Sequence, residues 1–315
     1  MKDYSGKYYI GMDAGGTGTS VLVSDGDKDL LQMKTEGLNC NSFPRERIAK
    51  SLQDVAEGLE GNGYALADCG AIVIGAAGNN NPAADALLRN LLEGCGFRCP
   101  VTVCSDADAA LYGALGEEDG ILLISGTGSI CLGQARGGRE RYRAGGFGHL
   151  IDDEGSAYAI GRDIAAAVVK AEDGRGPETT LRSALFGHLG ISGSSELVGY
   201  VYDMSHTKKD IARLARLISL PENEGDRATA QIIRKAVDGL LEMVAAVYGR
   251  MEARRCGPEL PLVLHGSVLR GNARIAGELA EAISHRLPGI RIAQARADAA
   301  HGAVGLARRG AGMPR

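Results

Sequence analysis

The chain has 315 residues, enough for one large domain or two of ordinary size. Charged residues make up 23% and apolar residues 44%, which is typical of a folded globular protein and not of a disordered one. The formal net charge is −4 and there is no run of five basic residues, so nucleic acid is not an expected partner. No apolar stretch approaches the ~20 residues that cross a bilayer, so no membrane partner is expected either.

Cysteine usage indicates a reducing compartment. The seven cysteines are odd in number and have no CxxC spacing, and no hydrophobic signal segment opens the sequence. We therefore expect a cytoplasmic protein without disulfides. Cys95 and Cys99 have CxxxC spacing and Cys104 follows, but there is no fourth cysteine close in sequence, which disfavours an iron-sulfur cluster.

The first 117 residues alternate strand and helix patterns. Three short apolar segments separated by turns predict consecutive antiparallel strands, and helices and strands then alternate as in an open α/β domain. The expected strands are 8–12, 20–24, 30–35, 71–76 and 101–105, and the expected helices are 44–58, the segment from Pro82, and 107–115.

The opening pattern returns at Gly120, which indicates an internal repeat. Strands 121–124, 130–134 and one ending at Arg143 repeat the first three, and a long helical stretch follows over about 155–255. The predicted end of the chain is a strand at 261–264, a helix at 272–287, a strand at 290–293 and a helix at 298–309. We therefore expect an N-terminal domain of residues 1–117 and a larger C-terminal domain of residues 118–315, whose last helix is free to pack back on the first domain.

The first turn of each copy contains Gly-Thr-Gly followed by a hydroxyl residue. Small residues let backbone amides approach an oxyanion closely, so each turn is a candidate phosphate loop, although either could be only a tight hairpin turn. Neither loop is a Walker motif or a dinucleotide fingerprint. Asp13 ends the strand before the first loop and suits Mg²⁺ held through water, or it only caps the turn.

Acidic residues mark two further places. Asp106 follows a strand at the sheet edge where open α/β folds bind ligands, which favours a general base. Asp106 could instead cap the next helix, and Asp108 could take either role. In the glycine-rich segment 144–158, Asp152, Asp153 and Glu154 could bind sugar hydroxyls or simply favour a helix N-terminus. No histidine pair has metal-ligand spacing.

Six ordered motifs together resemble the BadF/BadG/BcrA/BcrD-type ATPase family, and within it the N-acetylglucosamine kinases. They cover about residues 8–308 and read DAGGTGTS at Asp13, SDADAAL at Ser105, ISGTGS at Ile124, GGFGHLIDDEGSAY at Gly145, LHGSVLRGN at Leu264 and ADAAHGAVGLA at Ala297. The resemblance implies the fold of sugar kinases, Hsp70 and actin, with two ribonuclease-H-like domains around a central cleft. It also implies ATP and Mg²⁺ as cofactors, and a homodimer is compatible with it.

The resemblance assigns roles to individual residues. Asp106 matches the catalytic base that activates the 6-hydroxyl of an amino sugar, and Asp13 matches the carboxylate that organises Mg²⁺. The ATP and phosphate positions are Gly15, Gly16, Thr17 and Gly18, then Gly126, Thr127, Gly128 and Ser129, with the adenosine turn at Gly266 and Ser267. The sugar-contacting positions are Asn41, Gly78, Asn79, Gly146 and Asp153, together with Asp106.

The sequence does not identify which sugar accepts the phosphoryl group. Phe147 stands where such kinases can carry tryptophan, and the resemblance also includes kinases for glucosamine and for N-acetylmuramic acid. An activator-type ATPase of a CoA-ester reductase or dehydratase shares the fold, but it would need cysteines for an interface cluster. A sugar-sensing repressor would need an N-terminal DNA-binding segment, whereas the first strand here begins near Tyr8.

Overall fold

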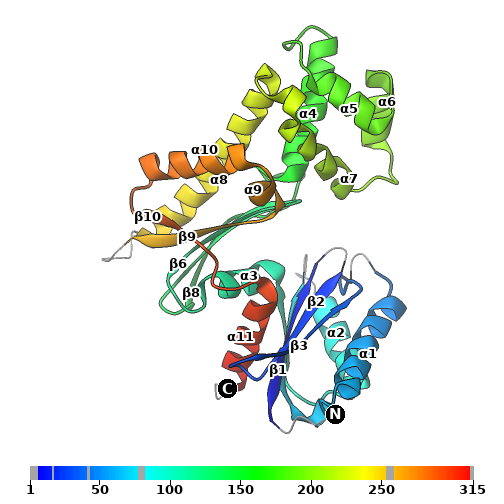
Figure 1. Ribbon diagram of the computed structural model, residues 1–315, viewed down its shortest axis with the longest axis vertical. Helices are drawn as coiled ribbons and strands as arrows, with labels where there is room; N and C mark the ends of the chain where they lie inside the picture. The colour runs from blue at the N-terminus through cyan, green and yellow to red at the C-terminus, as the bar shows by residue number, and fades with distance from the viewer. Residues whose placement is uncertain (1–5, 16–17, 41–42, 77–81, 253–258, 313–315) are drawn as a thin grey trace. The chain divides into compact units, whose positions relative to one another are not determined.

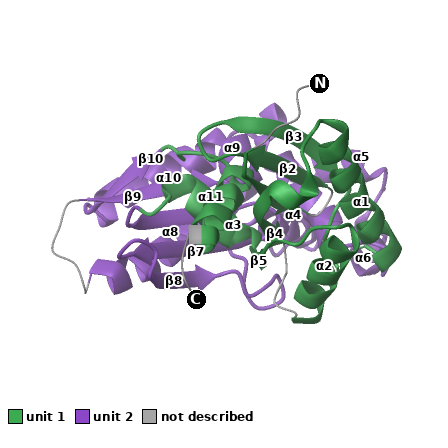
Figure 2. Ribbon diagram, turned by 90° about the horizontal axis from the view of Figure 1, so that it is seen from below, with its two compact units in different colours: residues 1–117, 294–315 green, residues 118–293 purple. Residues whose placement is uncertain are grey.

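The computed structural model describes residues 6–15, 18–40, 43–76, 82–252 and 259–312. The chain divides into two compact units, unit 1 with residues 1–117 and 294–315 and unit 2 with residues 118–293 (Figure 2). Each unit is built on a five-stranded sheet with helices (Figure 1), which confirms the expected α/β class. No helix in the described ranges has the length and apolarity needed to cross a membrane.

Unit 1 has a mixed sheet of order β3-β2-β1-β4-β5, in which β1 pairs antiparallel with β2 and parallel with β4. Its elements are β1 (Tyr8–Ala14), β2 (Thr19–Ser24), β3 (Asp29–Thr35), α1 (Arg45–Gly61), η1 (Leu66–Asp68), β4 (Cys69–Ala76), α2 (Pro82–Gly94), β5 (Val101–Ser105), α3 (Asp106–Leu115) and α11 (Ala299–Gly312).

Alternate residues of β4 face two different helical layers. Ile72 and Ile74 belong to a large apolar cluster with buried residues of α1 and α2, whereas Ala71 and Val73 pack with alanines of α3 and α11. This alternation follows from the two-residue period of a strand. The sheet of unit 1 is therefore covered on both faces, with large side chains on one and small ones on the other.

Small residues bring α11 from the far end of the chain onto this sheet. A Cβ on Gly11 of β1 would lie 2.3 Å from the Ala300 carbonyl oxygen, and a Cβ on Gly302 would lie 2.0 Å from the Ala109 carbonyl oxygen. Only glycine allows such backbone contact. The amides of Arg296 and Ala297 also donate to carbonyls of α3, at 3.1 and 2.9 Å, which fixes the start of α11 beside α3.

Unit 2 repeats the sheet topology with the order β10-β9-β6-β7-β8. The antiparallel triple β6-β7-β8 corresponds to β1-β2-β3, and β9 and β10 correspond to β4 and β5, which confirms the internal repeat. Its elements are β6 (Gly120–Ser125), β7 (Ser129–Ala135), β8 (Glu140–Gly145), α4 (Ala157–Glu172), α5 (Leu181–Leu189), α6 (Ser194–Tyr202), α7 (Lys208–Arg213), η2 (Leu214–Ser219), η3 (Pro221–Asn223), α8 (Arg227–Glu252), β9 (Leu260–His265), α9 (Ser267–Gly271), α10 (Ala273–Arg286) and β10 (Ile290–Ala293).

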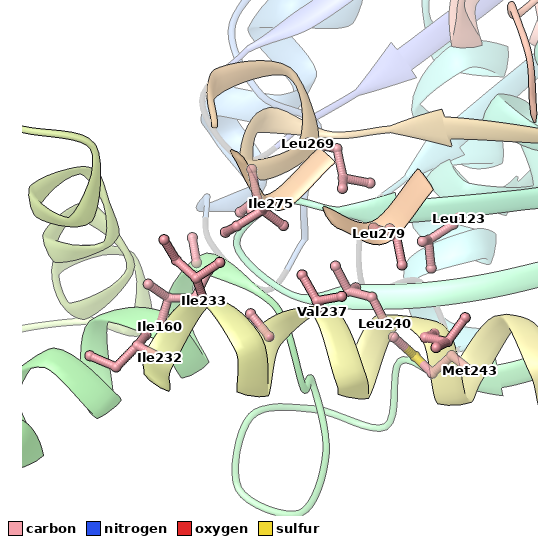
Figure 3. Packing of buried hydrophobic residues seen from close by; sticks show 14 of the residues in the cluster. Leu123, Ile160, Ile232, Ile233, Val237, Leu240, Met243, Leu269, Ile275 and Leu279 are labelled. Carbon is pink, nitrogen blue, oxygen red and sulfur yellow. The ribbon is translucent and has the colours of Figure 1, made fainter. Parts of the chain in front are cut away.

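The core of unit 2 is organised by the long helix α8, which packs on the sheet and on α10. Val237, Leu240 and Met243 follow the spacing of one helix face, and Figure 3 shows them near Leu123 of β6 and Leu279 of α10. Burial of this stripe against both partners holds the strand ends of the second repeat in place.

Candidate active site

Asp13 lies near the end of β1, in register with Gly75 of β4 and Ser20 of β2. Its carboxyl group is half-buried, and burial together with the negative charges of Asp106 and Asp298 raises its pKa. Burial penalises the charged form of a carboxyl group, and so do like charges nearby. The three carboxylates therefore interact within unit 1, and a cation placed among them would relieve their repulsion.

Asp106 is the first residue of α3 and follows β5 directly. The helix is capped by Ser105, whose Oγ accepts from the Asp108 amide at 3.0 Å and donates to Asp108 Oδ2 at 2.7 Å. The alternative in which Asp106 caps the helix is therefore wrong, because Ser105 is the N-cap residue and Asp108 contacts its side chain. Asp106 Oδ1 accepts from the amide of its neighbour Ala107 at 2.9 Å.

The fold adds Asp298 to this group, a residue to which the sequence motifs gave no role. It lies in the turn before α11, and its Oδ1 contacts Nδ1 of His301 at 2.7 Å. His301 Nε2 in turn lies 3.0 Å from Oδ2 of Asp29. Partial burial opposes the charged form of His301, but hydrogen bonds to both carboxylates outweigh it and raise the pKa of the imidazole. Position just before a helix was the signal in the sequence that could have singled out Asp298.

In the first phosphate-loop candidate, between β1 and β2, the structure describes Gly15 and Gly18. The Gly15 amide donates to the Gly18 carbonyl at 3.0 Å, which closes the turn between β1 and β2. The other expected positions of this loop and three expected sugar contacts lie outside the described residues, namely Gly16, Thr17, Asn41, Gly78 and Asn79.

The second phosphate-loop candidate is the turn between β6 and β7. The Gly126 amide donates to the Gly128 carbonyl at 2.9 Å, and the carbonyls of Gly126 and Thr127 accept from Ala157 and Tyr158 at the start of α4. Ser129 Oγ donates to the Glu154 carbonyl at 2.7 Å. The loop is therefore held by the segment that precedes and begins α4.

Asp153 is placed against this second loop. It is only 4% exposed, its backbone has a φ of +70°, and its Oδ1 accepts from the Ser129 amide at 3.2 Å. A Cβ at Gly128 would lie 2.9 Å from Asp153 Oδ2, so the loop needs glycine there. In the structure Asp153 therefore contacts and supports the turn between β6 and β7, and its expected contact with sugar stays a prediction.

The glycine-rich segment after β8 forms an exposed loop. Gly146 has a φ of +76°, and a Cβ there would lie 2.8 Å from the Ile130 side chain. Asp152 Oδ2 accepts from the Phe147 amide at 2.8 Å, so Asp152 closes this loop. Phe147 is 65% exposed, with the guanidinium carbon of Arg143 4.5 Å from its ring centroid. The loop thus presents an aromatic surface beside an arginine.

The expected adenosine turn lies directly beside the second loop. Gly266 has a φ of +103°, and a Cβ there would lie 2.1 Å from the Ser125 carbonyl oxygen. Ser267 follows, and its Oγ lies 3.8 Å from where a Gly126 Cβ would be. Within unit 2 the fold therefore brings two loops about 140 residues apart in the sequence into contact.

A cavity of about 380 Å³ opens beyond this turn, between η2, η3, the start of α8 and the junction of α9 with α10. Asn272 lines it and fixes its shape, because its Oδ1 caps α10 at the Ile275 amide and its Nδ2 donates to Ser219 Oγ at 2.9 Å. Apolar side chains such as Ile218, Leu220 and Ile233 line it together with polar ones. A mixed lining of this kind suits a flat heterocycle.

Direct protein coordination of a metal is not seen in the described ranges, where no three His, Cys, Asp or Glu side chains form a metal-binding group. Mg²⁺ commonly keeps several waters and uses one or two carboxylates with substrate phosphates. The carboxylates of Asp13 and Asp106, which interact with each other, fit that mode of binding.

Comparison with known proteins places these features in context. The model of the BadF/BadG/BcrA/BcrD ATPase family matches residues 10–307. The chain is 34% identical over 304 residues to N-acetylmuramic acid/N-acetylglucosamine kinase of Clostridium acetobutylicum, covering 96% of this chain and 98% of that protein. It is 28% identical over 315 residues to N-acetyl-D-glucosamine kinase of Dictyostelium discoideum, with the same coverage. The crystal structure of a candidate N-acetylglucosamine kinase from Chromobacterium violaceum superimposes with a TM-score of 0.74 at 23% identity, covering 96% of this chain and 99% of that one.

Proposed function

This chain belongs to the BadF/BadG/BcrA/BcrD ATPase family, and we propose that it is an ATP-dependent amino-sugar kinase that phosphorylates N-acetylglucosamine at its 6-hydroxyl. One observation carries the proposal. The chain matches two kinases of N-acetylated amino sugars over 96% of its length and 98% of theirs. Each element of the proposed reaction has residues suited to it.

Asp106 is the proposed general base. It accepts the proton of the sugar 6-hydroxyl as the oxygen attacks the γ-phosphorus of ATP, and the bond from that phosphorus to the bridging oxygen of ADP breaks. The N-cap of α3 is Ser105, whose side chain is in contact with Asp108, so the helix does not need Asp106 as its cap. Its position at the carboxyl end of β5 is where open α/β sheets bind ligands.

Asp13 is the proposed site for Mg²⁺, held mainly through water. When bound, the ion would neutralise charge on the phosphate oxygens. The support is the raised pKa of Asp13, which arises from burial and from the charges of Asp106 and Asp298. A divalent cation bound at Asp13 would offset that repulsion.

The nucleotide is proposed to bind through both phosphate loops and the turn at Gly266 and Ser267. The amides of the loops after β1 and β6 are suited to phosphate oxygens. The cavity that follows α9 is the proposed place for the adenine, because it begins five residues after Gly266 and combines apolar and polar lining. Asn272 connects two walls of the cavity, because its side chain donates to Ser219 at the end of η2 and accepts from the Ile275 amide in α10.

The acceptor is proposed to contact Asn41, Gly78, Asn79, Gly146 and Asp153 as well as Asp106. Phe147, in the loop after β8, offers an apolar face where other kinases of this type can carry tryptophan, so it is the position at which acceptor preference is expected to differ. N-acetylmuramic acid is a second candidate acceptor, because it is named in the kinase of C. acetobutylicum.

The direct test measures ADP release from MgATP with N-acetylglucosamine, N-acetylmuramic acid, glucosamine, glucose and no sugar, with product masses read in parallel. We expect release to depend on an N-acetylated amino sugar, with a product heavier by one phosphoryl group. Periodate sensitivity or NMR of the product assigns the hydroxyl. ADP release that ignores every sugar would contradict the proposal and favour an activator-type ATPase.

A further inference from the structure

Two cysteines far apart in sequence meet in unit 1. Cys69 is the first residue of β4 and is 6% exposed, and Cys99 lies two residues before β5 and is half-buried. Their Sγ atoms are 3.5 Å apart and share a hydrogen bond. The pairing follows from the sheet, because β4 and β5 run parallel with Ile72 opposite Val101, which places the segments before the two strands side by side.

The surroundings make the two thiols unequal. Cys69 belongs to the apolar cluster of this face, and its thiol contacts the Ala71 carbonyl at 3.7 Å. The hydrogen bond between the two sulfurs lowers the pKa of Cys99, whereas that bond and burial raise the pKa of Cys69. Tyr8 lies near both sulfurs, and its hydroxyl is held by the Ala65 carbonyl at 3.0 Å. Cys99 is thus the thiol that ionises first and the more accessible of the pair.

We propose that Cys69 and Cys99 form a redox-active pair that oxidises to an intramolecular disulfide. With a hydroperoxide as the oxidant, the Cys99 thiolate attacks a peroxide oxygen and the O–O bond breaks, giving Cys99 sulfenic acid and, after protonation, water or an alcohol. The Cys69 sulfur then attacks the Cys99 sulfur, the S–O bond breaks, and the hydroxyl leaves as water with the Cys69 proton. The protein loses two hydrogen atoms in total.

The geometry favours this bond over other pairings. The two sulfurs must approach by only about 1.5 Å to reach the disulfide length of ~2.05 Å. Cys95 is closer to Cys99 in sequence, but the sulfur in hydrogen-bond contact with Cys99 is that of Cys69. The bond would tie β4 to β5 at their amino ends, whereas Asp106 follows the carboxyl end of β5. The disulfide would therefore cross-link the sheet at the end opposite the proposed base.

The test treats the reduced full-length protein with hydrogen peroxide, blocks remaining thiols with N-ethylmaleimide, and maps peptides without reductant. We expect a peptide joining Cys69 to Cys99, an intact mass lower by two hydrogens before blocking, and reversal by dithiothreitol. The midpoint of thermal unfolding should rise by several degrees on oxidation, because the bond closes a loop of about 30 residues in the unfolded chain. The readouts are masses and unfolding, so they are independent of the proposed kinase activity.

Two cysteine variants test whether the disulfide involves Cys99 and not the nearby Cys95. C99A should abolish both the linked peptide and the rise in the unfolding midpoint, whereas C95A, which removes the cysteine at CxxxC spacing, should leave both unchanged. Recovery of Cys69 and Cys99 as separate alkylated peptides after oxidation would overturn the proposal. So would a disulfide from Cys99 to Cys95 or Cys104, or oxidation of Cys99 to sulfinic acid without a bond to Cys69.

Discussion

Replacement of Asp106 by asparagine tests the proposed general base with little change in shape. Asparagine keeps an oxygen that can accept from the Ala107 amide, a bond of 2.9 Å in the structure. The cap of α3 is made by Ser105 and Asp108, so the helix keeps its first turn. We therefore expect the free energy of unfolding to change by less than about 1 kcal/mol.

The effect on catalysis should be much larger than the effect on stability. Loss of a positioned base typically costs about 10²- to 10⁴-fold in rate, which corresponds to about 3–5 kcal/mol of transition-state stabilisation. We expect kcat with N-acetylglucosamine to fall by that factor in D106N while MgATP still binds. Removal of one of the charges that raise the pKa of Asp13 should also bring that pKa closer to its usual range.

The assay combines ADP release in steady state, calorimetric titration with MgATP, and thermal unfolding of each variant. D108N is the matched control, because it removes a charge from the same turn of α3 and leaves Asp106 in place. Its amide still donates to Ser105 Oγ, and the asparagine oxygen can still accept from that hydroxyl, so the cap is kept. We expect D108N to keep its kcat within a few fold. Retention of more than about a tenth of the rate by D106N, or an equal loss in D108N, would refute the assignment of Asp106 as base.

Three further predictions concern the frame around the site. In urea unfolding, G266A should destabilise the protein by about 3 kcal/mol or more, because a Cβ at this φ of +103° would lie 2.1 Å from the Ser125 carbonyl oxygen. The control G271A should be close to neutral, because nothing lies within 4 Å of a Cβ there. L240A should cost about 2–5 kcal/mol, because the side chain is fully buried in the core of Figure 3, and D238A on the exposed side of α8 is its control. The raised pKa of His301 should stabilise the fold below pH 6.5, its usual value, and this contribution should be lost as the pH rises through the folded-state pKa. Because His301 is partly exposed, the stability advantage of wild type over H301A should fall by no more than about 1 kcal/mol as the pH rises over that range. An advantage that grows with pH would contradict this prediction.

The sequence by itself determined the elements and their repetition. Apolar strands ending in Gly-Thr-Gly turns fix short hairpins locally, so the strands from Tyr8 and from Gly120 and the α/β class could be read without coordinates. Asp106 could be placed after a strand and before a helix for the same reason. These features depend on residues adjacent in the chain, which periodicity and turn chemistry report directly.

The tertiary structure alone decided which distant residues meet. Whether Ser105 or Asp106 caps α3 depends on where each side chain points, and both are ordinary cap-forming residues. Asp298 joins Asp13 only because α11 returns to unit 1, where it packs on β1 at Gly11 and, through its own Gly302, on α3. Cys69 meets Cys99 through the parallel pairing of β4 with β5, although the spacing in sequence draws attention to Cys95. Such contacts arise from packing across long sequence separations, and residue order along the chain does not encode them locally.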